Sequence, residues 1–133
     1  MEPIQQLRLL INLARADGHL AAKERQYIIN IGQANHLLVT EILPLFHDEN
    51  PVVIPAHLSD SEKFDFIFHL VQLMKIDEKI YQEEIKYCAQ VAAKLGYRKE
   101  VLLELMLNVK TVEMAEDEMD ALKKLTSRYL NPA

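Results

Sequence analysis

The sequence predicts an all-α protein of about seven helices, built as two related halves of three helices and a closing C-terminal helix. Three observations lead to this prediction. Apolar residues recur at helical spacing along most of the chain. Gly and Pro are scarce, with 3 and 5 among 133 residues, which disfavours a turn-rich β architecture. Residues 10–37 also correspond to residues 70–97 at a constant offset of 60, which indicates an internal repeat.

The first half is expected to contain three helices, whose ends follow from residues that favour turns. These helices cover about residues 3–16, 21–34 and 38–46. Asp17-Gly18 ends the first helix, and Asn35-His36 ends the second because Asn tolerates the left-handed conformation. The third helix is expected to be short or kinked, since Pro44 interrupts it.

The second half repeats this layout after an extended linker at about residues 47–60, which carries two prolines. The sequence leaves open whether Val53 and Ile54 cover the bundle or form an exposed apolar patch. Ser59 and Glu62 have the spacing of a capping box at the start of the next helix. Four helices follow, at about residues 60–76, 81–95, 98–108 and 113–130. The whole chain, residues 1–133, is expected to form one domain.

Composition excludes several classes of function. The net charge is −5 and there is no basic run, so nucleic-acid binding is not expected. Cys88 is the single cysteine, so no internal disulfide forms; its apolar surroundings predict a core residue. No apolar run approaches the ~20 residues of a membrane span, and the N-terminus lacks the pattern of a signal peptide. A cytoplasmic protein without membrane insertion is therefore the expectation.

The repeat spans about residues 4–46 and 64–109 and includes more than matched apolar positions. Its identical pairs include Leu10/Leu70, Leu13/Leu73, Asp17/Asp77, Glu24/Glu84 and Tyr27/Tyr87. Any two amphipathic helices share apolar positions, whereas two acidic residues and a tyrosine in one register are stronger evidence of duplication. The repeat therefore predicts halves related by a pseudo-twofold axis.

Asp17-Gly18-x-Leu20-x-x-x-Glu24 has the spacing of the second half of an EF-hand calcium loop. Leu13 and Arg15, however, occupy the positions of the earlier acidic ligands. Two side chains per repeat are too few for a tight calcium site. The predicted metal ligands are the four carboxylates Asp17, Glu24, Asp77 and Glu84, brought together by the pseudo-twofold axis to bind calcium, magnesium, manganese or zinc weakly. Alternatively, these residues only cap helices and bind no metal.

The segment "ARADGHLAAKE" (residues 14–24) and its echo "MKIDEKIYQEE" (residues 74–84) resemble the TerB-like family of tellurite-resistance proteins. The first helices of DjlA-type co-chaperones belong to the same superfamily. The resemblance covers about residues 4–110, and the second copy departs from it where Glu78 replaces the glycine. It implies a pseudo-twofold bundle of about seven helices without catalytic activity. It further implies a role in bacterial stress response through metal ions or protein contacts.

Two other groups of residues are candidates for function. Glu113, Glu116, Asp117 and Asp120 form one acidic stripe at the start of the last helix. This stripe is either a solvated face or a docking site for a basic partner. The five histidines show no H-E-x-x-H pattern, so zinc hydrolase chemistry is not expected.

Together these observations predict a non-catalytic cytoplasmic module that binds a protein partner, with weak divalent-cation binding at the acidic turns. The alternative is a structural homodimer that binds no metal and whose acidic turns only cap helices. A carboxylate-based hydrolase is the third hypothesis, and it requires a concave pocket in which two carboxylates differ in pKa.

Overall fold

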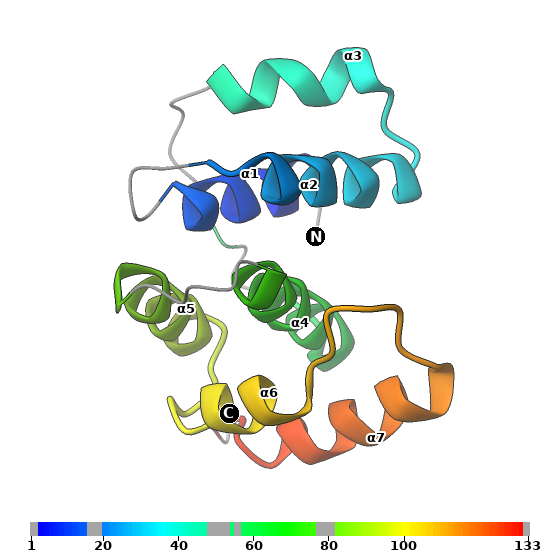
Figure 1. The fold of residues 1–133 in the computed structure, drawn as a ribbon. Helices are drawn as coiled ribbons and strands as arrows, with labels where there is room; N and C mark the ends of the chain where they lie inside the picture. The colour runs from blue at the N-terminus through cyan, green and yellow to red at the C-terminus, as the bar shows by residue number, and fades with distance from the viewer. Residues whose placement is uncertain (1–2, 16–19, 48–53, 55–56, 77–81, 132–133) are drawn as a thin grey trace.

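A computed structural model describes residues 3–15, 20–47, 54, 57–76 and 82–131, and this part of the chain is helical without a β-strand. The predicted all-α fold with about seven helices is confirmed (Figure 1). The elements are α1 Pro3–Ala14, α2 Ala22–Ala34, α3 Val39–Ile42, the 3-10 helix η1 Leu43–His47, α4 Asp60–Ile76, α5 Gln82–Lys94, α6 Val101–Asn108 and α7 Glu116–Ser127.

The helix ends agree with the sequence-based predictions at most positions. The capping box before α4 is confirmed, because the Ser59 N–H donates to Glu62 at 3.1 Å and the Glu62 N–H donates to Ser59 Oγ at 3.2 Å. Gly96 ends α5 with a φ of 94°, which a residue with a side chain rarely adopts. As predicted, α2 ends at Asn35-His36, but the left-handed residue is His36, with a φ of 67°, and not Asn35.

Asn35 instead has a φ of −98° and caps the C-terminal end of α2. Its side-chain Nδ2 donates to the Ile31 carbonyl at 2.8 Å, which satisfies one of the acceptors left free where the helix ends. The left-handed turn therefore falls one residue later. The predicted interruption of the next helix is confirmed, since α3 is four residues long and the chain continues from Leu43 as a 3-10 helix that includes Pro44.

The helices form two layers, with α1, α2 and α3 in one and α4 to α7 in the other (Figure 1). The helices α1 and α4 lie at the centre and pack against each other. Each also packs against the second helix of the opposite layer, α1 against α5 and α4 against α2. The core between them is built from fully buried side chains such as Leu10, Leu13, Leu70 and Leu73.

The two halves correspond closely in α2 and α5. Both helices contain 13 residues, and their bounds differ by the predicted offset of 60. Residues 22–32 and 82–92 agree in burial at every position except Ile31 and Val91. Even the buried charged position is shared, as Glu24 corresponds to Glu84. The same side of each helix therefore faces the core.

Polar side chains join the two halves in a reciprocal way. The Tyr27 hydroxyl on α2 donates to Gln72 Oε1 on α4 at 2.6 Å. Tyr87 on α5 is hydrogen-bonded to the side chain of Asn12 on α1. At the offset of 60, Tyr27 corresponds to Tyr87 and Asn12 corresponds to Gln72. Each tyrosine is therefore hydrogen-bonded to the side-chain amide of the other half. This exchange is the arrangement that a pseudo-twofold axis generates.

We expect Tyr27→Phe to lower the free energy of unfolding by about 1–2 kcal/mol, because the part-buried Gln72 oxygen loses its donor. Urea denaturation followed by circular dichroism measures this change. Tyr129→Phe is the matched control, since the Tyr129 hydroxyl bonds to Glu104 within one half, nearer the surface. A loss for Tyr27→Phe no larger than that for Tyr129→Phe would show that the bond between halves adds no stability.

Candidate functional site

The predicted metal ligands are only partly within the described residues. Asp17 and Asp77 lie outside them, whereas Glu24 and Glu84 are the third residues of α2 and α5. Both glutamates are buried, with 3 % and 1 % of their surface exposed. Glu24 Oε1 accepts the Ala21 N–H at 3.2 Å, so it caps the start of α2. This bond is the helix-capping role that the metal-free alternative predicts for Glu24.

The described residues do not assemble a metal site by themselves. No group of three or more His, Cys, Asp or Glu side chains comes together in this part of the chain. Glu24 and Glu84 supply too few oxygens for calcium, which takes 6–8 ligands. A cation at these turns would therefore also need oxygens from residues 16–19 and 77–81, which include Asp17 and Asp77. Metal binding by the four carboxylates stays a prediction.

Cys88 lies one helical turn after Glu84 and is fully buried, which confirms its predicted place in the core. Burial, with a further contribution from the Glu84 charge, raises the pKa of the Cys88 thiol to about 12. The thiol therefore stays protonated at neutral pH, and a protonated thiol is a poor nucleophile. The Cys88 Sγ lies 4.0 Å from the Met74 Sδ.

His69 is a polar residue between the two central helices. Its Nδ1 lies 3.1 Å from Nε2 of Gln6 on α1. Burial lowers the pKa of His69, and a hydrogen bond to the Asp65 backbone and the Asp65 charge oppose this shift only in part. His36, His47 and His57 are exposed. Of the described histidines, His69 is thus the one whose protonation is coupled to packing.

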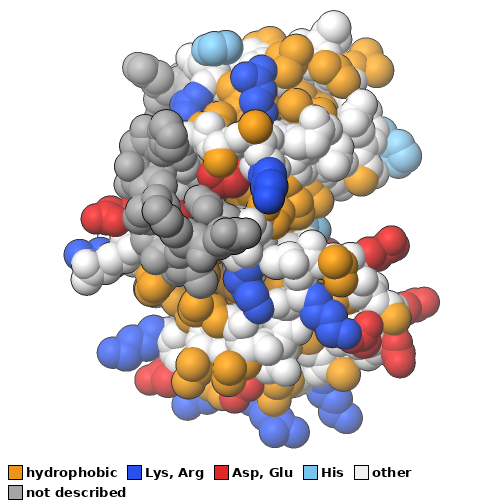
Figure 2. Space-filling model, viewed as in Figure 1, with side chains coloured by type: hydrophobic (Ala, Val, Ile, Leu, Met, Phe, Trp, Pro, Cys, Tyr) orange, Lys and Arg blue, Asp and Glu red, His pale blue; other side chains and the backbone are white. Residues whose placement is uncertain are grey.

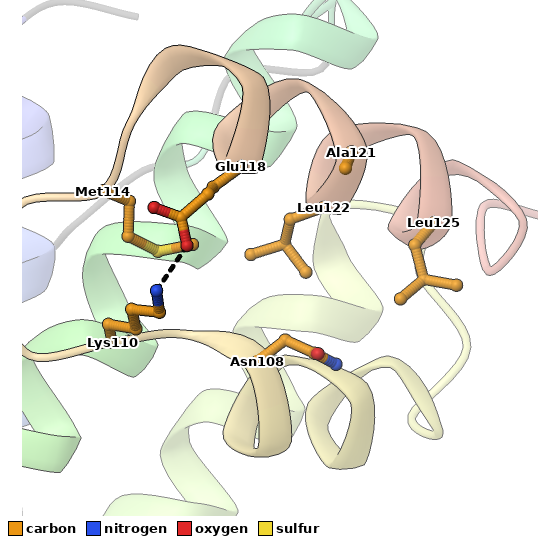
Figure 3. Close-up of a pocket in the computed structure, with 7 residues that line it drawn as sticks. All are labelled: Asn108, Lys110, Met114, Glu118, Ala121, Leu122 and Leu125. Carbon is orange, nitrogen blue, oxygen red and sulfur yellow. Dashed lines mark hydrogen bonds and ion pairs between the residues drawn. The ribbon is translucent and has the colours of Figure 1, made fainter.

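An open groove of about 290 Å³ lies between α6 and α7 (Figure 3). Its lining is mainly apolar, with Met114, Leu122 and Leu125 on the side of α7. Lys110 and Glu118 form an ion pair across one end of it. This pair lowers the pKa of Glu118, which keeps that carboxylate charged. The groove holds one carboxylate rather than the pair that the hydrolase hypothesis requires.

A second hollow of about 480 Å³ adjoins this groove and shares Asn108 and Lys110 with it. Leu107 and Val112 line the second hollow, and 73 % and 65 % of their surfaces are exposed. Leu103 lies one turn before Leu107 on α6 and is 66 % exposed. Large apolar side chains next to the groove are therefore exposed to solvent.

Side chains of α4 fix the position of the segment between α6 and α7 through hydrogen bonds. Lys75 Nζ donates to the carbonyls of Met106 and Val109 at 2.7 and 2.5 Å, where α6 ends. Gln72 Nε2 donates to the Lys110 carbonyl at 2.8 Å. Since these bonds satisfy carbonyls that a helix end leaves free, they fix the path of the chain from α6 toward α7.

Acidic side chains gather on the side of the molecule where α7 begins (Figure 2). Glu113, Glu116, Asp117 and Asp120 are all exposed. Because α7 begins at Glu116, the predicted helical stripe consists of Glu116, Asp117 and Asp120, and Glu113 precedes the helix. Glu116 and Asp120 lie about half a turn around α7 from Glu118, which lines the groove, so they face away from it.

The sequence did not reveal the groove itself, because Leu103 and Leu107 have the same helical spacing as core residues. The available signal was that six of the eight residues of the α6 sequence "VLLELMLN" are apolar, more than the single buried face of a surface helix requires.

The chain matches no protein-family model, no curated protein and no solved structure. The similarity to the TerB-like family accordingly rests on the residues quoted above. Within the part of the chain that the structure describes, no helix has the length and apolar character needed to cross a membrane.

If the acidic turns bind a cation, millimolar calcium, magnesium, manganese or zinc should raise the melting temperature of the protein, since a ligand of the native state stabilises it. Differential scanning fluorimetry with each metal measures this shift. Asp17→Asn and Glu84→Gln should reduce the shift, whereas Glu83→Gln, an exposed neighbour on α5, should not. Equal melting temperatures with and without metal would remove the metal hypothesis.

Acidification should destabilise the protein through His69. The unfolded chain binds this proton near pH 6.5, whereas burial lowers the pKa of His69 in the native state. Below that pH the unfolded state binds more protons, so stability falls as the pH falls. Melting temperatures at about pH 7.5 and 5.5 should differ less in His69→Gln than in the wild type. The exposed His57→Gln is the control, and an equal pH response of all three proteins would contradict this assignment.

Proposed function

We propose that the chain is a non-catalytic protein-interaction module of the TerB-like type. Its partner would bind the α6–α7 surface, which we define as Leu103, Leu107, Val112 and the groove of Figure 3. The observation that carries the proposal is the exposure of these three large apolar side chains beside an open groove. Contiguous exposed apolar surface is typical of binding sites, whereas single exposed leucines are not informative.

The exposed apolar side chains are contiguous. Leu103 and Leu107 are four residues apart and lie on one face of α6. Leu107 and Val112 line the same hollow, and that hollow shares Asn108 with the groove. The opposite face of α6 is already buried in the core through Val101 and Leu105. The outer face is therefore not needed for folding and is available to a partner.

The remaining parts of the proposal come from the sequence. We place the protein in the bacterial cytoplasm with a role in stress response, as the TerB-like resemblance implies. Weak binding of a divalent cation at the acidic turns is the second part of the proposal. Its structural support is that Glu24 and Glu84 place carboxylates at equivalent positions at the start of α2 and α5.

A structural homodimer is the second candidate function, and it has its own supporting observation. Leu38 is 66 % exposed and its neighbour Val39 is 38 % exposed, where α2 leads into α3. This site lies in the first half, on an element that the α6–α7 surface does not include. A dimer formed there would bury these residues and would not require metal.

Leu107→Asp should abolish partner binding with little effect on stability, because the side chain is exposed and a charge opposes burial in an interface. Light scattering should show a monomer, and tagged wild-type protein should retain a cellular partner that Leu107→Asp loses. Leu38→Asp introduces the same charge at a similarly exposed leucine and should keep the partner.

Two outcomes would decide against this function. A dimer that Leu38→Asp dissociates would support the structural homodimer. Equal partner retention by Leu107→Asp and the wild type would exclude the α6–α7 surface as the binding site.

A further inference from the structure

We infer that α7 is a hinged helix, which opens away from α4 and α6 while the rest of the bundle stays folded. Residues 111–115 are the hinge, and residues 128–131 form a clasp that holds the helix closed. The helix lies on the outer side of the layer that α4 to α7 form (Figure 1). This inference concerns how the α6–α7 surface is assembled, and it holds whether or not a partner binds there.

The first argument is that little of α7 is buried. Two of its 12 residues are buried, Leu122 and Thr126, whereas α1, which has the same length, buries six. The helix packs against α4 and α6, and Leu125 is half-buried where it lines the groove. Segments with few buried apolar contacts open at a lower free-energy cost than global unfolding. Detachment of α7 therefore costs less than disruption of the core around α1 and α4.

The second argument is that the chain before α7 is anchored only at its beginning. The Lys110 carbonyl accepts from Gln72 Nε2 at 2.8 Å, whereas the same nitrogen lies 3.5 Å from the Val112 carbonyl. A separation of 3.5 Å is too long for a strong hydrogen bond. Four of the five residues 111–115 are exposed, and these five residues form no helix. Rotation of their backbone can therefore move α7 while α6 keeps its position.

The third argument is the clasp at the far end of α7, which consists of hydrogen bonds near the surface. The Arg98 N–H donates to the Tyr129 carbonyl at 2.7 Å. The Asn131 N–H donates to the Gly96 carbonyl at 2.8 Å. The Arg98 guanidinium donates to the Arg128 carbonyl at 2.7 Å and lies 5.4 Å from the centre of the Tyr129 ring. Because water can replace each of these partners, the clasp can open and close reversibly.

Between the hinge and the clasp, two contacts of charged side chains join α7 to its neighbours. Lys110 pairs with Glu118, and Lys123 Nζ donates to Ser61 Oγ at the start of α4. Both contacts are exposed, and exposed contacts of this kind contribute little to stability. They position the closed helix and do not prevent its detachment.

Opening of α7 would take the groove apart. Leu122 and Leu125 line the groove from α7, and Figure 3 shows both side chains on the α7 side of it. A helix of 12 residues is marginal by itself in water, so α7 loses helical hydrogen bonds when it detaches. The closed position of α7 therefore determines whether the α6–α7 surface exists.

Thiol labelling distinguishes opening of α7 from global unfolding within one molecule. Thr126→Cys places a thiol at a position that is 0 % exposed, and the native Cys88 in the core is also 0 % exposed. Iodoacetamide at about pH 8 reaches either thiol only after an opening event, and peptide mass spectrometry reads the two sites separately. If α7 opens by itself, position 126 should be labelled at least about tenfold faster than Cys88.

Changes to the clasp show what holds α7 closed. Arg98→Ala removes the guanidinium contacts of the clasp and should speed labelling at position 126 by about tenfold, with little change at Cys88. Arg25→Ala is the matched control, since the Arg25 guanidinium also lies over an aromatic ring, 4.9 Å from the centre of Phe46, in the first half. This control should leave labelling at position 126 unchanged.

A second control tests whether an introduced cysteine itself promotes labelling. Ala92 on α5 is also 0 % exposed, so Ala92→Cys introduces a thiol at an equally buried position outside α7. This thiol should be labelled as slowly as Cys88, because both become accessible only when the core unfolds.

Equal labelling rates at position 126 and at Cys88 would overturn the inference, since α7 would then open only with the whole protein. Equal rates at position 126 in Arg98→Ala and Arg25→Ala would overturn the role of the clasp. If Thr126→Cys fails to fold, hydrogen–deuterium exchange of the unchanged chain makes the same comparison. The amides of α7 should then exchange at least about tenfold faster than those of α4, and equal protection would contradict the hinge.

Discussion

The packing of α1 against α4 is the contact on which both halves of the structure depend. The helix α4 packs against α1, α2, α5, α6 and α7, and its buried side chains extend around most of its circumference. A central helix of this kind cannot bury its surface within one half. Apolar burial contributes about 25 cal/mol per Å², so exposing the buried side chains of α1 and α4 by separating the layers would cost free energy. The halves therefore stabilise each other, although their sequences correspond as a repeat.

Polar side chains on α4 connect this central packing to the surface. The Gln72 side chain accepts a hydrogen bond from the Tyr27 hydroxyl of the first half. It also donates a hydrogen bond to the carbonyl of Lys110, a residue that lines the groove. Lys75, one turn later, donates to two carbonyls where α6 ends. Apolar packing alone would allow a helix to slide or rotate slightly, whereas hydrogen bonds of defined geometry fix one register. The helix that joins the halves thus also sets the position of the α6–α7 surface.

The sequence predicted the parts of the fold that local rules decide, and it missed those that tertiary contacts decide. Helical periodicity and the Ser59 capping box were sufficient to place α4. The start of α6 was predicted three residues too early, because the Arg98 N–H donates to the Tyr129 carbonyl at 2.7 Å instead of continuing a helix. The exposure of Leu103 and Leu107 could not be predicted for a similar reason. Helical spacing alone does not distinguish a leucine buried in the core from a leucine exposed on the surface. Asp17 and Asp77 lie outside the described residues, so their predicted convergence rests on the repeat alone.

The α6–α7 surface exists where the two halves cease to be alike. In the first half, the third helix is the short α3, followed by η1, whose Leu45 and Phe46 are buried. In the second half, α6 is followed by α7, which packs on α4 and α6 and has no counterpart among the first three helices. The groove lies between α6 and this additional helix. The core is formed by the two corresponding halves, whereas the surface proposed for binding depends on α7, the helix beyond the predicted repeat. Changes on α7 that alter the groove would therefore leave the contacts between α1 and α4 intact.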